Sequence, residues 1–234
     1  MGKRIIPQRR GRGTSTYRSP SHRHKGLPRY PRVEKAEGVV VDIFHAPGRS
    51  TPMAKVRFDE ETALMLAPEG LRMNQPIHIG PGSPVELGNA LPLEEIPEGT
   101  LVHNIEARPG DGGKFVRTAG TSATVVTRGK KKTIVQMPSG VFKHIDSKSL
   151  ATIGILAGSG RTDKPLAKAG KSFHAYRSKA KRPKRVKGIA MNPVNHPHGG
   201  GGHPHVGTQS SPSYNAPPGR KVGRMAPKPK RRKQ

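Results

Sequence analysis

The positive charge of this 234-residue chain lies mainly at its two ends, and this distribution limits where a folded core can form. Residues 1–36 carry 11 Lys and Arg against one acid, and residues 166–234 carry 17 with no Asp or Glu. The segment between them has 15 basic and 14 acidic residues, and the net charge of the whole chain is +28. Self-repelling segments bury too little apolar surface to offset an ordering entropy of about 1–2 kcal/mol per residue. We therefore expect the middle to fold and the ends to order on a polyanion.

The composition favours small domains over one large core. Only 31% of the residues are hydrophobic and 4% are aromatic, and the chain contains 29 Gly and 24 Pro. It has no Cys, which excludes disulfides and thiolate zinc sites and is compatible with a reducing, cytoplasmic compartment. No run of 18 apolar residues occurs, so no membrane span is expected. Pro and Gly residues in the first 31 positions break the amphipathic helix of an organelle transit peptide.

Short runs rich in β-branched residues predict about nine strands in the middle segment. Their ranges are 39–44, 54–58, 64–66, 75–79, 101–105, 123–127, 133–137, 141–145 and 151–155. Turn residues separate these runs, and no helix of three turns is indicated. The pattern predicts an all-β fold of two small antiparallel barrels in series. The expected parts are a basic extension at 1–36, barrels at 37–84 and 85–165, and a second basic extension at 166–234.

The extensions carry the cations expected to neutralise nucleic-acid phosphates. Five of them fall within residues 181–187, where Pro183 prevents a continuous helix. Aromatic residues punctuate the extensions and are candidates for stacking on exposed bases, namely Tyr17, Tyr30, Phe173, Tyr176 and Tyr214. The cations assigned to binding are Arg9, Arg10, Arg12, Arg18, Arg23, Lys25, Arg177, Lys181, Arg182, Lys184, Arg185, Lys187, Arg220 and Lys221, with Arg117 in the second barrel.

The Gly and Pro content of the extensions favours folded RNA over duplex DNA as the polyanion. An extended backbone with these residues can pass through narrow, irregular grooves, whereas DNA recognition usually presents a helix or ribbon to one regular groove. Two alternatives remain at this point. The cations could package DNA without sequence preference, and the run at 181–187 also fits a nuclear or nucleolar address.

The most unusual local pattern is His196-Pro197-His198, four glycines and His203-Pro204-His205. Four imidazoles within ten residues could hold a metal, which gives a metal-dependent nucleic-acid enzyme as an alternative function. No carboxylate or thiolate lies nearby to complete such a site. A Pro turn followed by glycines that approach RNA closely explains the same pattern. We expect no metal site, no catalytic residue and no cofactor, any magnesium being associated with the RNA.

An ordered series of short motifs runs through the second half of the chain. They lie at 88–93, 102–104, 109–113, 119–121, 138–140 and 151–154, followed by 169–171, 191–194 and 196–201. In this order they resemble the second domain and C-terminal extension of the ribosomal protein two family of the large subunit. The second His-Pro-His step and the Arg-rich opening resemble the archaeal or eukaryotic branch of that family.

The resemblance implies an oligonucleotide-binding-type barrel, an SH3-like barrel and two extensions that run into large-subunit ribosomal RNA towards the peptidyl transferase centre. It implies a structural, non-enzymatic protein of cytoplasmic ribosomes that supports assembly and subunit association. Neighbouring ribosomal proteins and the small subunit are the further partners implied. The loop residues carried over are Asn192, Asn195, His196, His198, Gly199 and Gly200.

Within the family, His196 corresponds to a histidine that has been discussed in connection with peptidyl transfer. The bacterial pattern has Asp at the preceding position, where this chain has Asn195. This difference weakens any role in which a carboxylate orients the imidazole or raises its pKa. We therefore expect His196 to have a positional role.

Overall fold

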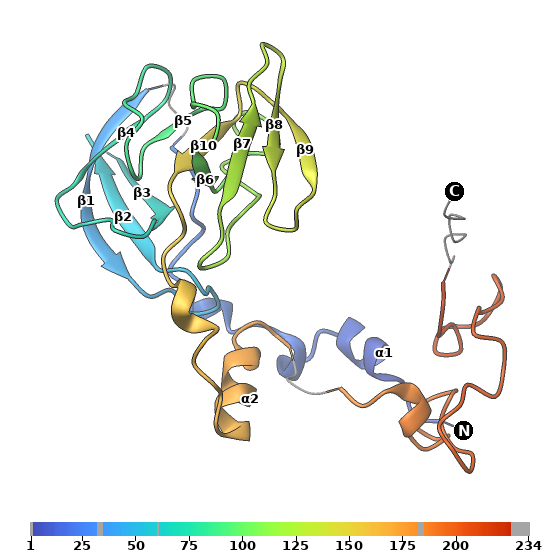
Figure 1. Ribbon diagram of the computed structural model, residues 1–234. Coiled ribbons are helices and arrows are strands. Elements are labelled where there is room, and N and C mark those ends of the chain that lie inside the picture. The colour runs from blue at the N-terminus through green and yellow to red at the C-terminus, as the bar shows by residue number, and fades with distance from the viewer. Residues whose placement is uncertain (1, 32–34, 60, 182–184, 226–234) are drawn as a thin grey trace. The chain divides into compact units, whose positions relative to one another are not determined.

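The computed structural model describes residues 2–31, 35–59, 61–181 and 185–225 (Figure 1). The chain divides into two compact units, of which one is Ser21–Pro165 and the other combines Met1–Pro20 with Leu166–Gln234. All strands of the described residues belong to the first unit, and the described residues of the second form short helices, turns and irregular segments. The all-β prediction is therefore confirmed. Division of the first unit into two barrels stays a prediction.

Ten strands form one sheet in the order β3-β2-β1-β4-β5-β10-β6-β7-β8-β9. The sequence predicts nine of them and misses β5, because its three residues are all buried and show no alternation. All neighbouring pairs are antiparallel except β4 and β5, which are parallel at Ile79 and Ala90. The strands are β1 Ala36–Phe44, β2 Met53–Phe58, β3 Glu61–Leu66, β4 Pro76–Ile79, β5 Ala90–Pro92, β6 Leu101–His103, β7 Ala123–Thr127, β8 Lys132–Gln136, β9 Phe142–Asp146 and β10 Leu150–Ile153.

The parallel link between β4 and β5 corrects the expectation of purely antiparallel strands. Residues 80–89 form a ten-residue connection between the two strands, not a tight hairpin turn. Asn89 fixes this connection, because its Nδ2 donates to the Pro84 carbonyl at 3.0 Å and its Oδ1 accepts the His78 N–H at 2.9 Å. The chain therefore enters β5 in the direction of β4, which a two-residue hairpin does not permit.

Alternation of apolar and charged residues determines which face of each strand is buried. In β2 the side chains of Ala54, Val56 and Phe58 are buried, while Lys55 and Arg57 are exposed. This is the two-residue period of a half-buried strand. The buried residues form two main clusters, one centred on β1, β2 and β4 and one on β6 to β8 and β10, and a smaller cluster made by Ala46, Met53, Leu66 and Leu156.

One buried carboxylate organises the glycine-rich loop that follows β6. Glu106 is 1% exposed. Its Oε1 accepts the Gly112 N–H at 2.8 Å, and its Oε2 accepts the Gly110 N–H at 3.1 Å and the Leu150 N–H at 3.0 Å. Three donors replace the hydration that this carboxylate loses on burial. The side chain thus joins the loop to the beginning of β10.

The other unit contains two short helices, α1 Ile6–Gly11 and α2 Ala169–Arg177, and the 3-10 turns Ser15–Tyr17 and Gly188–Ala190. Gln8 Oε1 accepts the Ile5 N–H at 3.1 Å, which satisfies a donor at the start of α1. The 3-10 turns Ser21–Arg23 and Ser159–Arg161 belong to the strand-containing unit. Within the described residues, no helix has the length and apolar character needed to cross a membrane. The order of the extensions before assembly stays a prediction.

Candidate nucleic-acid interface

The segment 188–200 folds into a compact loop held by its own backbone. The N–H groups of Asn195 and His196 both donate to the Asn192 carbonyl, at 2.9 and 3.2 Å. The Gly199 N–H donates to the His196 carbonyl at 2.9 Å, and the Gly200 N–H donates to the Met191 carbonyl at 2.8 Å. Gly200 has a φ of 84°, a conformation that glycine adopts without strain. The glycines therefore close the loop, in addition to allowing a ligand to approach.

The two imidazoles of this loop lie close together. The centroids of the His196 and His198 rings are 5.2 Å apart with an edge-to-face orientation. The His198 N–H donates to Nδ1 of His196 at 3.0 Å. Partial burial lowers the pKa of His196 below its ordinary value, and the neighbouring His198 lowers it further. Both effects favour the neutral form of His196.

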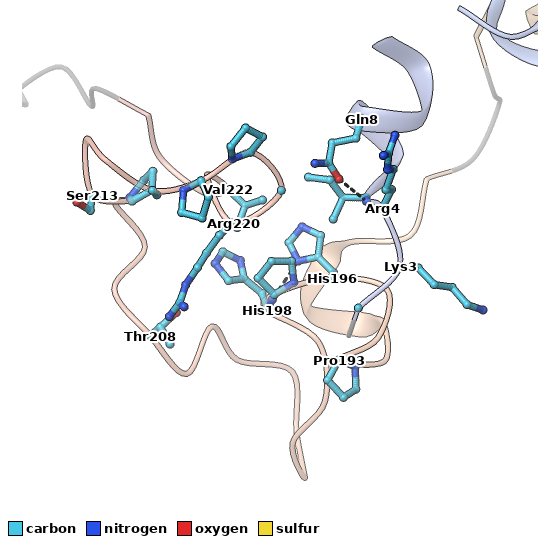
Figure 2. Close-up of a pocket in the computed structure, with 18 of the residues that line it drawn as sticks. Lys3, Arg4, Gln8, Pro193, His196, His198, Thr208, Ser213, Arg220 and Val222 are labelled. Atoms are coloured by element: carbon cyan, nitrogen blue, oxygen red, sulfur yellow. Dashed lines mark hydrogen bonds between the residues drawn. The ribbon is translucent and has the colours of Figure 1, made fainter. Parts of the chain in front are cut away.

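The N-terminal residues pack against this loop within the same unit. The Lys3 N–H donates to the Val194 carbonyl at 2.7 Å, and Ile5 is 7% exposed. A cavity of about 1000 Å³ lies between the N-terminal residues and residues 193–222. Figure 2 shows His196 and His198 in it, with Arg4 and Arg220 among the labelled lining residues. Residues 1–20 and 166–234 contain no Asp or Glu, so this cavity has no acidic side chain from its own unit.

Two smaller cavities bring together other residues predicted from the sequence. One of about 380 Å³ is lined by Arg9, Asn192 and Asn195 together with apolar Ile6 and Met191. The other, of about 290 Å³, is lined by Phe173, Arg177 and Lys181 with Ser15 and Thr16. The second combines cations with an aromatic ring, a combination typical of single-stranded nucleic-acid sites.

Most of the predicted cations are exposed. Among the cations, Arg10 is half-buried, and Arg182 and Lys184 lie outside the described residues. Tyr17, predicted as a stacking residue, is also half-buried. No ion pair in the described part of the chain involves any predicted cation. The exposed ones are Arg9, Arg12, Arg18, Arg177, Lys181, Arg185, Lys187, Arg220 and Lys221 in the unit of the extensions, and Arg23 and Lys25 in the strand-containing unit.

Two residues that the sequence suggested for nucleic-acid contact are used by the fold. The Arg117 guanidinium donates from Nη1 to the Gly113 carbonyl at 2.7 Å and from Nη2 to the Pro28 carbonyl at 2.8 Å. Tyr30 is 5% exposed, and its hydroxyl donates to the Asn104 carbonyl at 2.8 Å and lies 2.7 Å from Thr152 Oγ1. The stacking role suggested for Tyr30 is wrong, because its ring belongs to the core.

The second His-Pro-His step forms a separate pair of rings. The centroids of His203 and His205 are 4.7 Å apart, and both residues are exposed. In the part of the chain that the structure describes, no three His, Cys, Asp or Glu side chains are arranged to hold a metal ion.

Sequence reasoning missed two residues that line the large cavity and two that are buried in the fold. Lys3 and Arg4 line the large cavity, and Glu106 and His103 are buried in the strand-containing unit. The glycine-rich loop at 109–113 was a usable signal for Glu106, as it was for Asp111 within the loop, since clustered backbone N–H groups favour carboxylates. The burial of His103 had no signal in the sequence, because it depends on strands that meet only in the folded chain.

Comparison with known proteins gives consistent matches. Residues 86–227 match the family described as "Ribosomal Proteins L2, C-terminal domain". The chain is similar to "Large ribosomal subunit protein uL2" of Methanothermobacter thermautotrophicus, with 52% identity over 233 residues and 97% of each chain covered. The uL2 protein of Methanosphaera stadtmanae is 52% identical over 235 residues, covering 97% of this chain and 98% of that one. The uL2 protein of Natronomonas pharaonis is 50% identical over 232 residues, covering 97% and 96%.

Proposed function

Because the chain belongs to the uL2 family of large ribosomal subunit proteins, we propose that it is a structural component of that subunit and binds its ribosomal RNA. The observation that carries this proposal is the unit built from the two extensions, where exposed cations surround cavities and no acidic residue occurs. Phosphates that bind there release condensed counterions, which supplies most of the sequence-independent affinity. The protein contributes position and charge, and the RNA performs the chemistry.

The strand-containing unit, unlike the unit of the extensions, carries acidic as well as basic side chains. Its 10-stranded sheet and near-neutral middle segment suit a docking body that positions the extensions. In this proposal the unit consists of an oligonucleotide-binding-type barrel followed by an SH3-like barrel. The separate core clusters of the two halves of the sheet support that division.

The site residues in this proposal are those of the extensions and the histidine loop. The cations neutralise phosphate, and the loop 192–200 approaches RNA closely near the peptidyl transferase centre. Neighbouring ribosomal proteins and the small subunit are the further partners, and cytoplasmic ribosomes are the location. The protein supports assembly of the large subunit and its association with the small one.

Family membership does not support a metal-dependent nucleic-acid enzyme or a general DNA-packaging protein. The relatives are named as components of a ribosomal subunit, and their names mention no enzymatic activity. A metal-dependent nuclease would require imidazole nitrogens with free lone pairs, and Nδ1 of His196 is not one of these, because it accepts a backbone N–H. A DNA-packaging protein requires no ordered loop of the kind formed at residues 188–200.

Sedimentation of a cell lysate tests the proposal directly. The native protein should run with large ribosomal particles at physiological salt. Purified full-length protein should also bind large-subunit ribosomal RNA more tightly than duplex DNA at about 0.3 M salt, where nonspecific phosphate binding is weakened. Migration free of ribosomal particles, or equal affinity for the two nucleic acids, would contradict the proposed function.

A further inference from the structure

The backbone of the histidine loop selects one tautomer of His196. The His198 N–H points at Nδ1 of His196, with 3.0 Å between the two nitrogen atoms. A ring nitrogen that accepts a hydrogen bond carries no proton, so the proton of the neutral ring is on Nε2. Partial burial and the neighbouring His198 favour this neutral ring by lowering the pKa of His196. The nitrogen left for a ligand is therefore a hydrogen-bond donor.

The orientation of this donor is fixed by close packing. A Cβ placed on Gly188 would lie 2.5 Å from Nδ1 and 2.7 Å from Nε2 of His196, so the backbone of Gly188 lies directly against the ring. The backbone of His196 is held on both sides, because its N–H donates to Asn192 and its carbonyl accepts the Gly199 N–H. The ring therefore has little freedom to turn.

The cavity that His196 lines is suited to an anion. Arg4 and Arg220 line it on opposite sides of His196 and His198, whereas the Lys3 side chain points away from the two histidines (Figure 2). The residues of this unit include no carboxylate that could compete for these donors. A neutral N–H donor in a cavity lined by arginines and free of acids suits an anionic oxygen acceptor.

We propose that this cavity binds one phosphate group of the RNA backbone, with His196 donating from Nε2–H and Arg4 and Arg220 supplying charge. The inference rests on the proposed function and adds the chemical group bound and the role of the histidine. His196 is a positioning residue here and not a general base, since the nitrogen that meets the ligand already carries the proton.

Nitrogen NMR of the full-length protein labelled with ¹⁵N-histidine tests the tautomer without any substitution. At a pH of about 7.5, Nδ1 of His196 should resonate as an unprotonated nitrogen and Nε2 as a protonated one. Added inorganic phosphate should shift the Nε2–H signal, while chloride at the same ionic strength should not. A protonated Nδ1, or equal responses to phosphate and chloride, would overturn the proposal.

A matched pair of variants tests the role in RNA binding. His196→Gln keeps an N–H donor that reaches the position of Nε2, whereas the shorter side chain of His196→Asn ends near the position of Nδ1 and places no donor there. Affinity for large-subunit ribosomal RNA at about 0.3 M salt should stay within about twofold for Gln and fall about ten- to hundredfold for Asn. Equal affinities of the two variants, with wild-type binding intact, would refute this inference alone. Failure of the wild-type protein to bind the RNA would refute the proposed function.

Discussion

At the scale of single residues, Glu106 is the most consequential buried charge. Its two oxygens accept three backbone N–H groups, from Gly110, Gly112 and Leu150. Glu106→Gln replaces one oxygen by an NH₂ group that faces a donor, so at least one buried N–H loses its partner. We expect the free energy of unfolding in urea to fall by about 1–3 kcal/mol.

The exposed Glu86 provides the control for this substitution. Glu86→Gln makes the same chemical change without a buried acceptor, and should alter the free energy of unfolding by less than about 0.5 kcal/mol. Equal effects of the two substitutions would show that Glu106 is not a structural acceptor.

His103 gives the fold a defined pH dependence. The residue is 0% exposed, and its Nδ1 lies 2.9 Å from the Gly154 carbonyl. Burial lowers the pKa of His103 from 6.5 to about 4. Between these values the unfolded chain binds a proton that the folded chain does not, so stability is complete above about pH 6.5 and falls as the pH decreases. The loss between a pH of about 7.5 and about 5 should be on the order of 2 kcal/mol.

Urea unfolding at several pH values measures this effect. His103→Asn keeps a donor for the Gly154 carbonyl and removes the titrating ring, so its stability should change less between these pH values than that of the wild type. Identical pH profiles for the two proteins would exclude His103 as the source. The test compares slopes, so a general destabilisation by the substitution does not obscure it.

At the scale of elements, Arg117 attaches residues 28–30 to the loop that follows β6. Its guanidinium donates to the Pro28 and Gly113 carbonyls, and Tyr30 is anchored next to it in the core. Arg117→Lys removes the planar fork that reaches both carbonyls. We expect hydrogen exchange of the Arg29 and Tyr30 amides to quicken and the free energy of unfolding to fall by about 1–3 kcal/mol.

Arg128→Lys is the matched control, because Arg128 is exposed and lies in the turn between β7 and β8. It should leave hydrogen exchange of the Arg29 and Tyr30 amides unchanged. If Arg117→Lys weakens RNA binding and leaves both stability and exchange intact, its main role is contact with RNA and not attachment of this segment.

At the scale of the whole molecule, the location of the cations should determine the salt dependence of RNA binding. Lys179, Lys181, Arg185 and Lys187 are exposed in the C-terminal extension. Replacing all four with Gln should reduce the slope of log affinity against log salt by about 3, since each phosphate contact contributes about 0.7–0.9. Filter binding of large-subunit ribosomal RNA across a salt series measures this slope.

The strand-containing unit offers a control with the same change in charge. Lys130, Lys131, Lys132 and Lys148 are exposed on it. Their replacement by Gln should change the slope by less than the four substitutions in the extension. An equal reduction would show that the sheet contributes as much phosphate binding as the extension, and would contradict a division of labour between the two units.

The sequence by itself determined the class of the fold and the class of partner. Alternation and turn residues are local properties, so the strand runs at 54–58 and 123–127 were predictable. The absence of acids from the C-terminal extension is likewise readable without a structure. Strand β5 was missed because its three buried residues show no alternation of apolar and polar side chains. The parallel pairing of Ile79 with Ala90 depends on the path of the loop between β4 and β5, which the sequence pattern does not indicate.

Only the tertiary structure decided which of the predicted residues hold the fold. Arg117 and Tyr30 look in the sequence like ligands for RNA, but both make hydrogen bonds to backbone carbonyls. The tautomer of His196 follows from one N–H two residues away, whose direction is set by the closed loop. Charge and hydrophobic periodicity are properties of the sequence and can be read from it directly. Hydrogen-bond direction and burial depend on the position of atoms, which only the folded chain provides.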